Sequence, residues 1–544
     1  MTAPSRIHSV VDMTNSEQFF PRAATGQRRH RAIRGVVASL TVLAVVTGVA
    51  ACEAGDNQSG TTGPTVHRSD LDSFYRQQVA WHACAQDAAD SIGQALDTAG
   101  AECAEVRVPL DYGDPQGRQI TVAMSRLQAA DAADRIGVLL VNNGGPGLPA
   151  VESPPQVREA MGTTGERFDI IGFDPRFVGR STPLDCGWPT GAAIYSAGTT
   201  RDSFEAQVAF QKDLADRCAA TNASVLPYIT TRNTARDMDV VRGALGEERI
   251  SYLGYSYGTY LGTVYTQLFP DRTDRMVLDG AIAPDDYNSQ LLKGLDDINE
   301  QALADWAEWT AVQQSTYQLG ATGPEVLATV RGIIEDAGRA PLRVGPVALD
   351  DTQIPLLIFQ GLPDDTDAAR AALAEKVALL AEAADGKTVR PSEGFAALLT
   401  AVFTDVDTNL GTAQAAIGCG DVAAARDPEA YWHDIEASSA KNPVFGPLAD
   451  NISLCAFWAP PREELTQVSI DAAPLIVAAT GDPRTTYASS QKLHRELPSS
   501  RLLTLDGAKR HGLYGQYGNR CVDLAVTDYL DTGHLPAHDP SCTL

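Results

Sequence analysis

One pentapeptide constrains this chain more than any other feature, the run Gly254-Tyr255-Ser256-Tyr257-Gly258. It follows a short apolar run at 250–253 and opens a stretch that is typical of a helix. A sharp turn from strand to helix crowds the backbone around a strained central residue, so side chains fit poorly at the two glycine positions. The pattern therefore predicts a nucleophilic Ser256 at the tip of this turn, with an ordinary turn of the same composition as the alternative.

Short apolar runs recur along the chain and alternate with helical patterns. In 233–245, for example, Met238, Val241 and Leu245 recur at three- and four-residue spacing. Uninterrupted apolar runs are typical of strands that are covered on both faces, and strand alternating with helix predicts an α/β fold with a mostly parallel sheet. The predicted strands are 106–109, 120–124, 136–141, 168–173, 250–253, 275–278, 475–480 and 501–505.

The alternation of strand and helix stops after Pro284 and resumes at 475. The intervening chain contains Ala-rich stretches that are typical of helices, and we expect residues 286–465 to form a helical lid inserted into the fold. Open α/β sheets bind ligands at the carboxyl ends of their strands, so the lid is expected to cover that edge. The two parts of the core would then be 69–285 and 466–544, the second with the catalytic Asp and His.

The first 51 residues have the layout of a signal peptide, with six arginines against two acids and then an uncharged run from Gly35 to Ala51. Small residues before Cys52 resemble a bacterial lipobox, which predicts that Cys52 is lipidated. A signal peptide cleaved nearby and an uncleaved anchor are the alternatives. Residues 52–68 are expected to be a flexible tether. We therefore expect an exported protein, either a cell-envelope lipoprotein or a secreted extracellular protein, that meets a membrane only through this segment.

Charge and cysteine content exclude two classes of function. The formal net charge of −26 argues against a nucleic-acid partner. No Cys-x-x-Cys occurs, which argues against zinc and thioredoxin-type chemistry. Eight further cysteines in an exported chain predict disulfides, and pairing of sequence neighbours is one of many possibilities, favoured by short loops. The expected pairs are Cys84 with Cys103, Cys186 with Cys218, Cys419 with Cys455, and Cys521 with Cys542.

A serine nucleophile needs a general base, and strand–turn–helix nucleophiles are followed in chain order by the acid and then the histidine. Three of the four histidines in the last part of the chain fit this role poorly. His494 lies in a predicted helix, and His534 and His538 lie in the terminal tail. His511 falls in a loop shortly after the last predicted strand, so we predict His511 as the general base.

The acid is expected at the end of the preceding strand, where Asp482 follows 475–480. There it would orient the imidazole and stabilise its protonated form. Asp482 could instead cap the next helix, because Asp before Pro is a frequent helix start. Asp279, which ends an earlier predicted strand, could supply the acid in a variant arrangement.

Acyl transfer also needs donors for the developing oxyanion. One is expected to be the backbone N–H of Tyr257, directly after the nucleophile. The other should come from the glycine-rich loop 142–147, in which Pro146 has no N–H. Gly144 or Gly145 must then supply it, and we favour Gly145. The loop lacks the residues of a phosphate cradle, and we predict no metal and no cofactor.

Together these pieces resemble a known family, the actinobacterial secreted tripeptidyl aminopeptidase-like α/β-hydrolases, a serine peptidase group related to proline iminopeptidases. The resemblance implies the α/β-hydrolase fold and release of short peptides, typically tripeptides, from free N-termini through a Ser–His–Asp triad and an acyl-enzyme. A carboxylesterase or lipase with the same triad, acting on small esters, is the alternative, and an inactive binding protein on this scaffold is a third hypothesis. The matching motifs are 108–112, 143–147, 168–176, 254–258, 277–280, and the closing Asp482, His511, Cys521 and Cys542.

Two departures from the family pattern concern substrate preference. Phe177 stands where the family usually has Gly, and Asn143 stands where related iminopeptidases have His. An exopeptidase of this kind also needs a group in the lid that holds the α-ammonium group of the substrate, most simply a carboxylate. Asp421 is the candidate, because a disulfide at Cys419 would hold it in place. A surface acid or a helix cap is the alternative.

Overall fold

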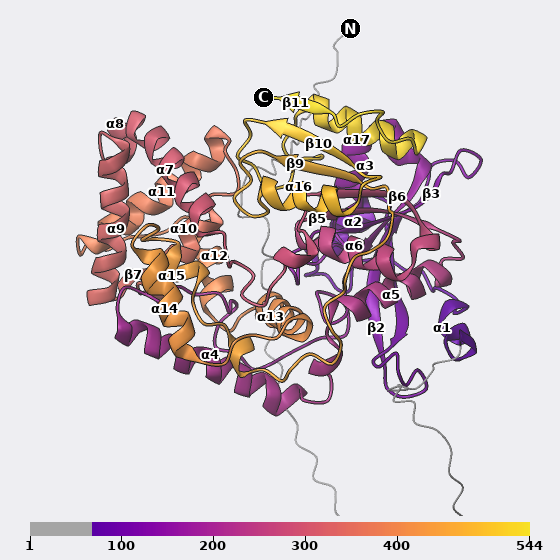
Figure 1. Ribbon diagram of the computed structural model, residues 1–544, viewed down its shortest axis with the longest axis horizontal. Coiled ribbons are helices and arrows are strands. Elements are labelled where there is room, and N and C mark those ends of the chain that lie inside the picture. The colour runs from indigo at the N-terminus through magenta and orange to yellow at the C-terminus, as the bar shows by residue number, and fades with distance from the viewer. Residues whose placement is uncertain (1–67) are drawn as a thin grey trace, which may run out of the picture.

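The computed structural model describes residues 68–544, so the predicted signal peptide, Cys52 and the tether up to residue 67 lie outside the described residues. A nine-stranded sheet of order β1-β2-β4-β3-β5-β6-β9-β10-β11 forms the core (Figure 1). β2 pairs antiparallel with both β1 and β4, and every other pairing in the sheet is parallel. The strands are β1 Glu102–Pro109, β2 Gln119–Leu127, β3 Gly137–Asn142, β4 Phe168–Phe173, β5 Ile250–Tyr255, β6 Thr273–Asp279, β9 Leu475–Ala479, β10 Arg501–Asp506 and β11 Ser541–Thr543.

The mostly parallel sheet predicted from the sequence is confirmed, and each of the eight predicted strands is present. β11 and the hairpin of β7 (Leu342–Val344) and β8 (Val347–Leu349) were not predicted. Each of these strands has three residues. A run that short shows no alternation or apolar block that could be read from the sequence.

Helices cover both faces of the sheet. α3 and α17 pack on one face through Val157, Met161, Val522 and Val526. α5, α6 and α16 pack on the other face, where they share a second buried cluster. β5 lies centrally and is buried along its whole length, which explains why its sequence is mostly apolar and contains no charged residue. The helices of this part are α1 Asp72–Tyr75, α2 Ser91–Thr98, α3 Pro154–Met161, α4 Arg201–Asn222, α5 Thr231–Ala244, α6 Tyr257–Leu268, α16 Tyr487–Glu496 and α17 Arg520–Thr532.

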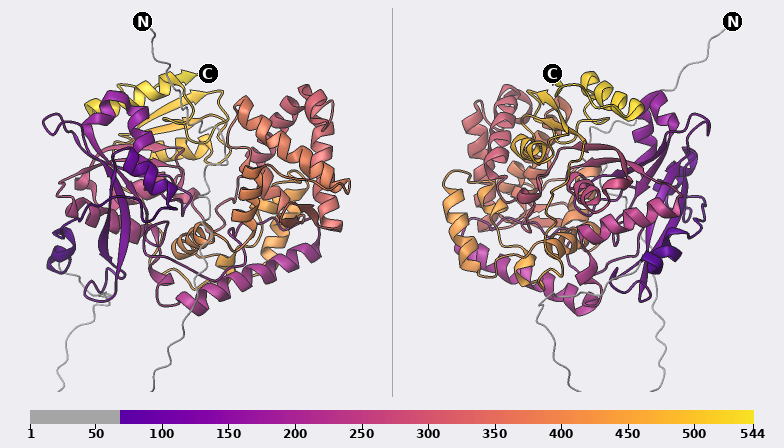
Figure 2. Two further views of the ribbon diagram at one scale, coloured as in Figure 1. Left: turned by 180° about the vertical axis from the view of Figure 1, so that it is seen from behind. Right: turned by 45° about the vertical axis from the view of Figure 1, so that its right-hand side comes forward.

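A second lobe, formed mainly by helices, lies beside the sheet (Figure 2) and has its own buried core around Trp306, Val330, Leu399 and Phe445. We call residues 286–465 the insertion. α4, which precedes the insertion in sequence, runs along this lobe, and the rings of Phe204 and Trp432 lie 5.3 Å apart. The helices of the insertion are α7 Asp296–Val312, α8 Gln314–Tyr317, α9 Gly323–Arg339, α10 Ile354–Gln360, α11 Asp367–Ala384, α12 Glu393–Phe403, α13 Asn409–Asp421, α14 Pro428–Ser439 and α15 Gly446–Ala449.

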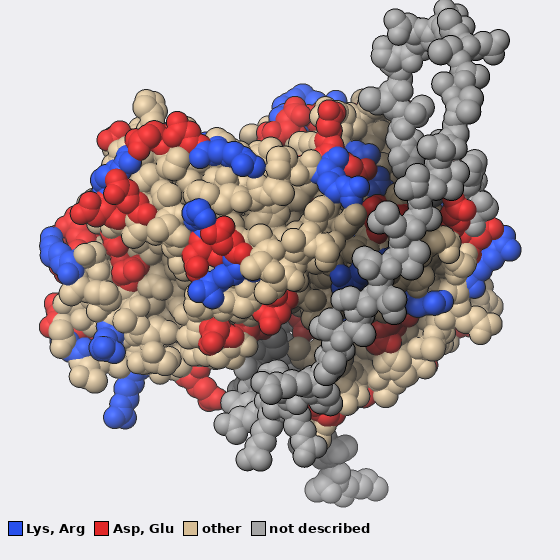
Figure 3. Space-filling view, turned by 90° about the horizontal axis from the view of Figure 1, so that it is seen from below, with Lys and Arg blue, Asp and Glu red and all other residues tan. Residues whose placement is uncertain are grey.

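Four disulfides connect segments that are close in sequence. Their pairing is the one expected from sequence proximity, Cys84–Cys103, Cys186–Cys218, Cys419–Cys455 and Cys521–Cys542. Among residues 68–544, no helix has the length and apolar character needed to span a membrane. On the face seen in Figure 3, Lys and Arg side chains lie scattered among Asp and Glu side chains rather than gathered in one patch.

Candidate active site

Ser256 occupies a strained turn between β5 and α6. Its φ is +55°, a conformation that is uncommon for a residue with a side chain. A Cβ at Gly254 would lie 2.5 Å from the carbonyl oxygen of Gly258, and a Cβ at Gly258 would lie 2.8 Å from Oδ1 of Asn142. Both glycines are therefore sterically required. Ser256 stands at the N-cap position of α6, but its side chain makes no capping hydrogen bond. Its hydroxyl is therefore not bonded to the helix backbone.

His511 and Asp482 form a hydrogen-bonded pair. Nδ1 of His511 lies 2.9 Å from Oδ2 and 3.1 Å from Oδ1 of Asp482, whose side chain is buried. Because an ionised carboxylate only accepts, the proton is assigned to Nδ1, which leaves Nε2 free to act as a base. Asp482 in turn accepts hydrogen bonds from the N–H groups of Arg484 and Thr485, and Thr485 Oγ1 donates to its Oδ2 at 2.8 Å.

Thr485 was not among the predicted site residues. Its hydroxyl lies 2.8 Å from Oδ2 of Asp482 and 3.3 Å from Nδ1 of His511, so it contacts both members of the pair. The only sequence signal is a threonine three residues after the acid, and that spacing is also typical of a helix start. The structure was therefore needed to find it.

The three predicted residues follow strands whose carboxyl ends lie along one edge of the sheet. Ser256 follows β5, Asp482 follows β9 and His511 follows β10, and β6 lies between β5 and β9. The N–H of Ser256 donates to the carbonyl oxygen of Asp279 at 2.9 Å, at the end of β6. A Cβ on the next residue, Gly280, would lie 3.3 Å from Cε1 of His511. Asp279 therefore contacts the serine turn, and the next residue, Gly280, lies beside the imidazole of His511.

The glycine-rich loop runs beside the serine turn. A Cβ at Gly144 would lie 3.0 Å from Cβ of Ser256 and 3.1 Å from the nitrogen of Tyr257. The N–H of Gly144 donates to Oδ1 of Asn142 at 3.0 Å and is therefore occupied. No acceptor for the N–H of Gly145 is found among residues 68–544. Tyr257 is the first residue of α6, so its N–H has no acceptor within the helix. The N–H groups of Gly145 and Tyr257 are therefore better candidates than that of Gly144 for hydrogen bonds to an oxyanion.

Asp279 is buried beside the pair but is bonded to the backbone rather than to the imidazole. Its Oδ2 accepts the N–H groups of Leu513 and Tyr514 at 2.9 and 2.7 Å. Its Oδ1 has no partner among the described residues. Burial raises the pKa of this carboxyl to about 6.

Asp421 lies at the end of α13, next to the Cys419–Cys455 disulfide, and connects the insertion to α5. Its Oδ1 accepts the N–H of Thr231 at 2.8 Å, and its Oδ2 accepts the hydroxyls of Thr231 at 2.6 Å and Tyr287 at 3.0 Å. Burial raises its pKa to about 7, against the opposite effect of these hydrogen bonds. The hydroxyl of Tyr257, which follows the nucleophile, lies 2.5 Å from that of Thr231.

Helix α13 also contacts the loops around the serine turn. A Cβ at Gly147 would lie 2.9 Å from the nitrogen of Gln414, and Asn409 accepts the N–H of Gly179 at 2.9 Å. Phe177, one of the two departures from the family pattern, is buried. Asn143, the other, donates to the carbonyl oxygen of Pro149 and so stabilises its own loop.

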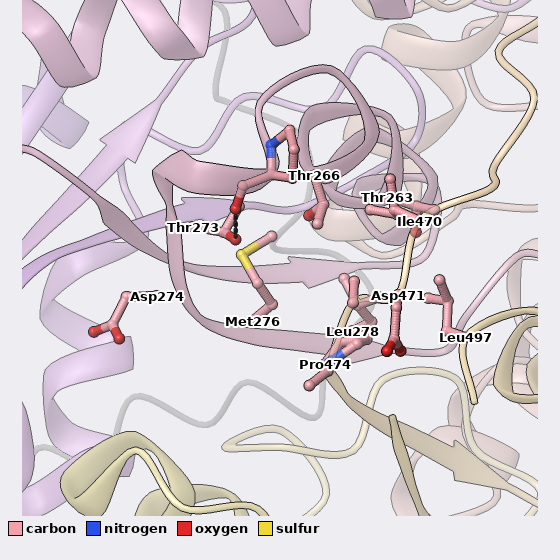
Figure 4. Close-up of a pocket in the computed structure, with 13 residues that line it drawn as sticks. Thr263, Thr266, Thr273, Asp274, Met276, Leu278, Ile470, Asp471, Pro474 and Leu497 are labelled. Carbon is pink, nitrogen blue, oxygen red and sulfur yellow. Dashed lines mark hydrogen bonds between the residues drawn. The ribbon is translucent and has the colours of Figure 1, made fainter. Parts of the chain in front are cut away.

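A cavity of about 210 Å³ lies elsewhere on the sheet (Figure 4). Thr273 and Asp274 at the start of β6 and Pro474 just before β9 line it, so it is located at the amino ends of the strands. The hydroxyls of Thr263 and Thr266 in its wall donate to helix carbonyls. The cavity is therefore separate from the candidate active site, which lies at the opposite edge of the sheet.

Comparisons with known proteins show the family of this chain. Residues 137–324 match the family model described as alpha/beta hydrolase fold, and residues 442–542 match the model described as TAP-like protein. The chain is similar to a tripeptidyl aminopeptidase of Streptomyces lividans, with 32% identity over 86% of this chain and 87% of the relative. It is also similar to serine protease Hip1 of Mycobacterium tuberculosis, with 29% identity over 86% and 91% of the two chains. A carboxylesterase B of the same species is 32% identical over 86% of this chain and 90% of the relative.

Proposed function

Because this chain belongs to the TAP-like family of α/β-hydrolases, we propose that it is an exported serine exopeptidase that releases short peptides, tripeptides by resemblance, from free N-termini. That the chain is a serine hydrolase related to peptidases follows from its relatives. The observation that best supports the proposal is the bond between His511 and Asp482 at the same sheet edge as Ser256.

In the proposed mechanism, Oγ of Ser256 attacks the scissile carbonyl while Nε2 of His511 takes the hydroxyl proton. The N–H groups of Tyr257 and Gly145 stabilise the oxyanion. As the C–N bond breaks, the imidazolium returns its proton to the leaving amine, and an acyl-enzyme remains. A water molecule, deprotonated by His511, then hydrolyses the ester and frees Ser256. Asp482 holds the imidazole in orientation and stabilises its charged form throughout.

Asp421 is the proposed ligand for the substrate's α-ammonium group. Its position beside Thr231 and close to Tyr257 supports the proposal, because Tyr257 directly follows the nucleophile. With a pKa of about 7, Asp421 is partly protonated at neutral pH, and an ammonium group would bind its ionised form. We therefore expect binding of free N-termini to weaken as the pH falls below about 7.

Export is proposed for the mature chain. The four disulfides support it, because disulfides persist in oxidising compartments. Whether the protein ends as a lipoprotein through Cys52 or as a free secreted enzyme is tested by mass spectrometry of its mature N-terminus.

A comparison of three substrates tests the activity. The full chain and Ser256→Ala are assayed with a tripeptide arylamide that has a free N-terminus, its N-acetylated form and a short aryl ester. We expect cleavage of the free tripeptide, little cleavage of the acetylated one, and no activity of Ser256→Ala. Ser499→Ala, which removes an exposed hydroxyl in the turn before β10, is the control and should behave as wild type.

Each result that departs from this pattern rejects one part of the proposal. Turnover of the ester alone rejects the peptidase and favours a carboxylesterase, the second candidate, which is supported by the similarity to carboxylesterase B. Equal cleavage of the acetylated peptide rejects the exopeptidase. Activity that survives in Ser256→Ala rejects the site itself.

A further inference from the structure

We propose that the insertion is a positioning element for catalysis, because it holds the loops of the acid and the base in place and balances the charges next to the base. This inference rests on the proposed function of Asp482 and His511. The residues responsible are Asn299 on α7 and the segment 363–365 between α10 and α11.

The insertion binds the loop of the acid through two helices. Nδ2 of Asn299 donates to the carbonyl oxygen of Pro483 at 2.8 Å, and Arg484 donates to Oδ1 of Asn299 at 2.7 Å. The guanidinium of Arg484 also lies over the ring of Phe359 on α10, 3.3 Å from its centroid, and donates to the carbonyl oxygen of that residue. Pro483 and Arg484 are the two residues after Asp482, so the insertion holds the chain on this side of the acid.

The insertion also binds the loop of the base through its backbone. The N–H of His511 donates to the carbonyl oxygen of Pro363 at 2.9 Å, and the N–H of Lys509 donates to Oδ2 of Asp365 at 2.7 Å. Bonds to the core hold this loop on either side, at Ala508 through Gly481 and at residues 513 and 514 through Asp279. The backbone of 509–511 itself is bonded to the insertion.

The contacts between the insertion and these two loops matter because catalytic groups tolerate little displacement. A misplacement of about 1 Å can cost about 100-fold in rate. The sheet determines where each strand ends, but the loops beyond the strand ends need further contacts to be held that closely. Here the further contacts for Lys509 and His511 come from a lobe with its own core.

Ion pairs between the insertion and the loop of His511 are the second kind of contact. Lys509 and Arg510 directly precede His511, and two cations beside an imidazole oppose its protonation. Carboxylates of the insertion pair with both, Asp305 with Lys509 and Asp364 with Arg510, and the second pair is largely buried, with 12% of each side chain exposed. The other titratable or charged groups around His511 are Asp482, Asp279, Arg484, Asp365 and Tyr517.

Removal of Asp364 is expected to leave Arg510 without its partner and to disfavour protonation of the imidazole. Removal of Arg510 has the opposite effect. The two variants should therefore shift the acid limb of the pH–rate profile in opposite directions, by about half a pH unit each. A general loosening of the fold would not produce opposite shifts.

The test uses the full chain with Asp364→Asn, Arg510→Gln, the double variant and Asn299→Ala, assayed on the short aryl ester between pH 5 and pH 9. The ester has no α-ammonium group, so changes at the amine site do not enter. Glu463→Gln is the matched control, because Glu463 is an insertion carboxylate that pairs with a core arginine, Arg236, at 2.7 Å on a helix without a predicted triad residue. A fluorophosphonate probe counts the reactive Ser256 in each preparation.

We expect kcat of Asp364→Asn and of Asn299→Ala to fall roughly tenfold with little change in KM. The acid limb moves to lower pH in Asp364→Asn, to higher pH in Arg510→Gln, and returns toward wild type in the double variant, while Glu463→Gln changes neither. The inference is overturned if kcat of Asp364→Asn and Asn299→Ala, or the acid limbs of Asp364→Asn and Arg510→Gln, match those of Glu463→Gln. If Asp364→Asn does not fold, Arg510→Gln and Asn299→Ala decide by the same criteria. Failure of the proposed function shows separately, as ester turnover in Ser256→Ala.

Discussion

Replacing Asp421 by asparagine should remove a specific pH dependence from the stability of the folded protein. The Asp421 side chain is 8% exposed and accepts three hydrogen bonds from Thr231 and Tyr287. Burial outweighs these bonds and raises its pKa from 3.8 to about 7. The folded chain therefore keeps a proton on this carboxyl over a range in which the unfolded chain has lost it.

The size of the effect follows from proton linkage. Between pH 4 and pH 7 the folded state binds more protons at this site than the unfolded state, so stability falls as the pH rises. The stabilising contribution is complete below pH 4 and is lost as the pH passes about 7. A shift of about 3 units at about 1.4 kcal/mol each amounts to about 4 kcal/mol over the whole range. Asparagine does not titrate. The free energy of unfolding of the variant should therefore rise relative to that of wild type by about 1.4 kcal/mol for each pH unit between pH 4 and pH 7.

Urea unfolding followed by tryptophan fluorescence at pH 4.5, 5.5, 6.5 and 7.5 measures this difference. We expect the free energy of unfolding of Asp421→Asn relative to wild type to rise with pH. Asp97→Asn is the control, because Asp97 also accepts two backbone N–H groups, those of Cys84 and Ala85, from a half-buried position. Parallel stability curves for Asp421→Asn and wild type, or a variant that loses stability as the pH rises, would refute the reasoning.

Three further predictions concern single contacts. Thr485→Val removes the hydroxyl 2.8 Å from Asp482, and kcat on the tripeptide arylamide should fall about tenfold with KM nearly unchanged; a large rise in KM alone would contradict this. Gly144→Ala places a Cβ 2.4 Å from the carbonyl oxygen of Tyr255, the residue before Ser256, at a backbone φ of +86°. This should displace the serine turn, so kcat should fall at least about 100-fold. Gly100→Ala, with a φ of +80° and no neighbour within 4 Å, is its control and should keep full activity. Opening the Cys419–Cys455 disulfide by substitution of both cysteines with serine releases a loop with a sequence separation of 36 and should cost about 4 kcal/mol of stability in urea unfolding, and an unchanged midpoint would contradict it.

The fold could be predicted from the sequence, and the residues of the candidate site could be proposed from it, because their signals are local. β5 carries no charged residue since it is buried along its whole length, and the glycines at 254 and 258 are required because a Cβ there would lie 2.5 Å from Gly258 and 2.8 Å from Asn142. His511 and Asp482 were proposed as base and acid from their positions after strands, and the structure places Nδ1 of His511 2.9 Å from Oδ2 of Asp482. The disulfides could also be predicted from the sequence, because each connects two cysteines that are neighbours in sequence.

Choices that depend on distant side chains needed the tertiary structure. The sequence left Gly144 and Gly145 as alternatives, and the side chain of Asn142 distinguishes them by occupying the N–H of Gly144. Asp279 looked like an alternative acid, and only the fold shows that its carboxylate binds the backbone at 513 and 514.

By itself, the sequence determined the eight longer strands of the sheet, their order in the chain, and which residues stand at their ends. Periodicity, glycine sterics and chain order are properties of short segments, so they survive without any knowledge of packing. The tertiary structure decided how the insertion meets the core. Asp364 and Arg510, or Asn299 and Pro483, are more than a hundred residues apart in the chain, and their contact depends on how two lobes pack. No local pattern encodes such a contact, because its free energy exists only once both lobes are folded.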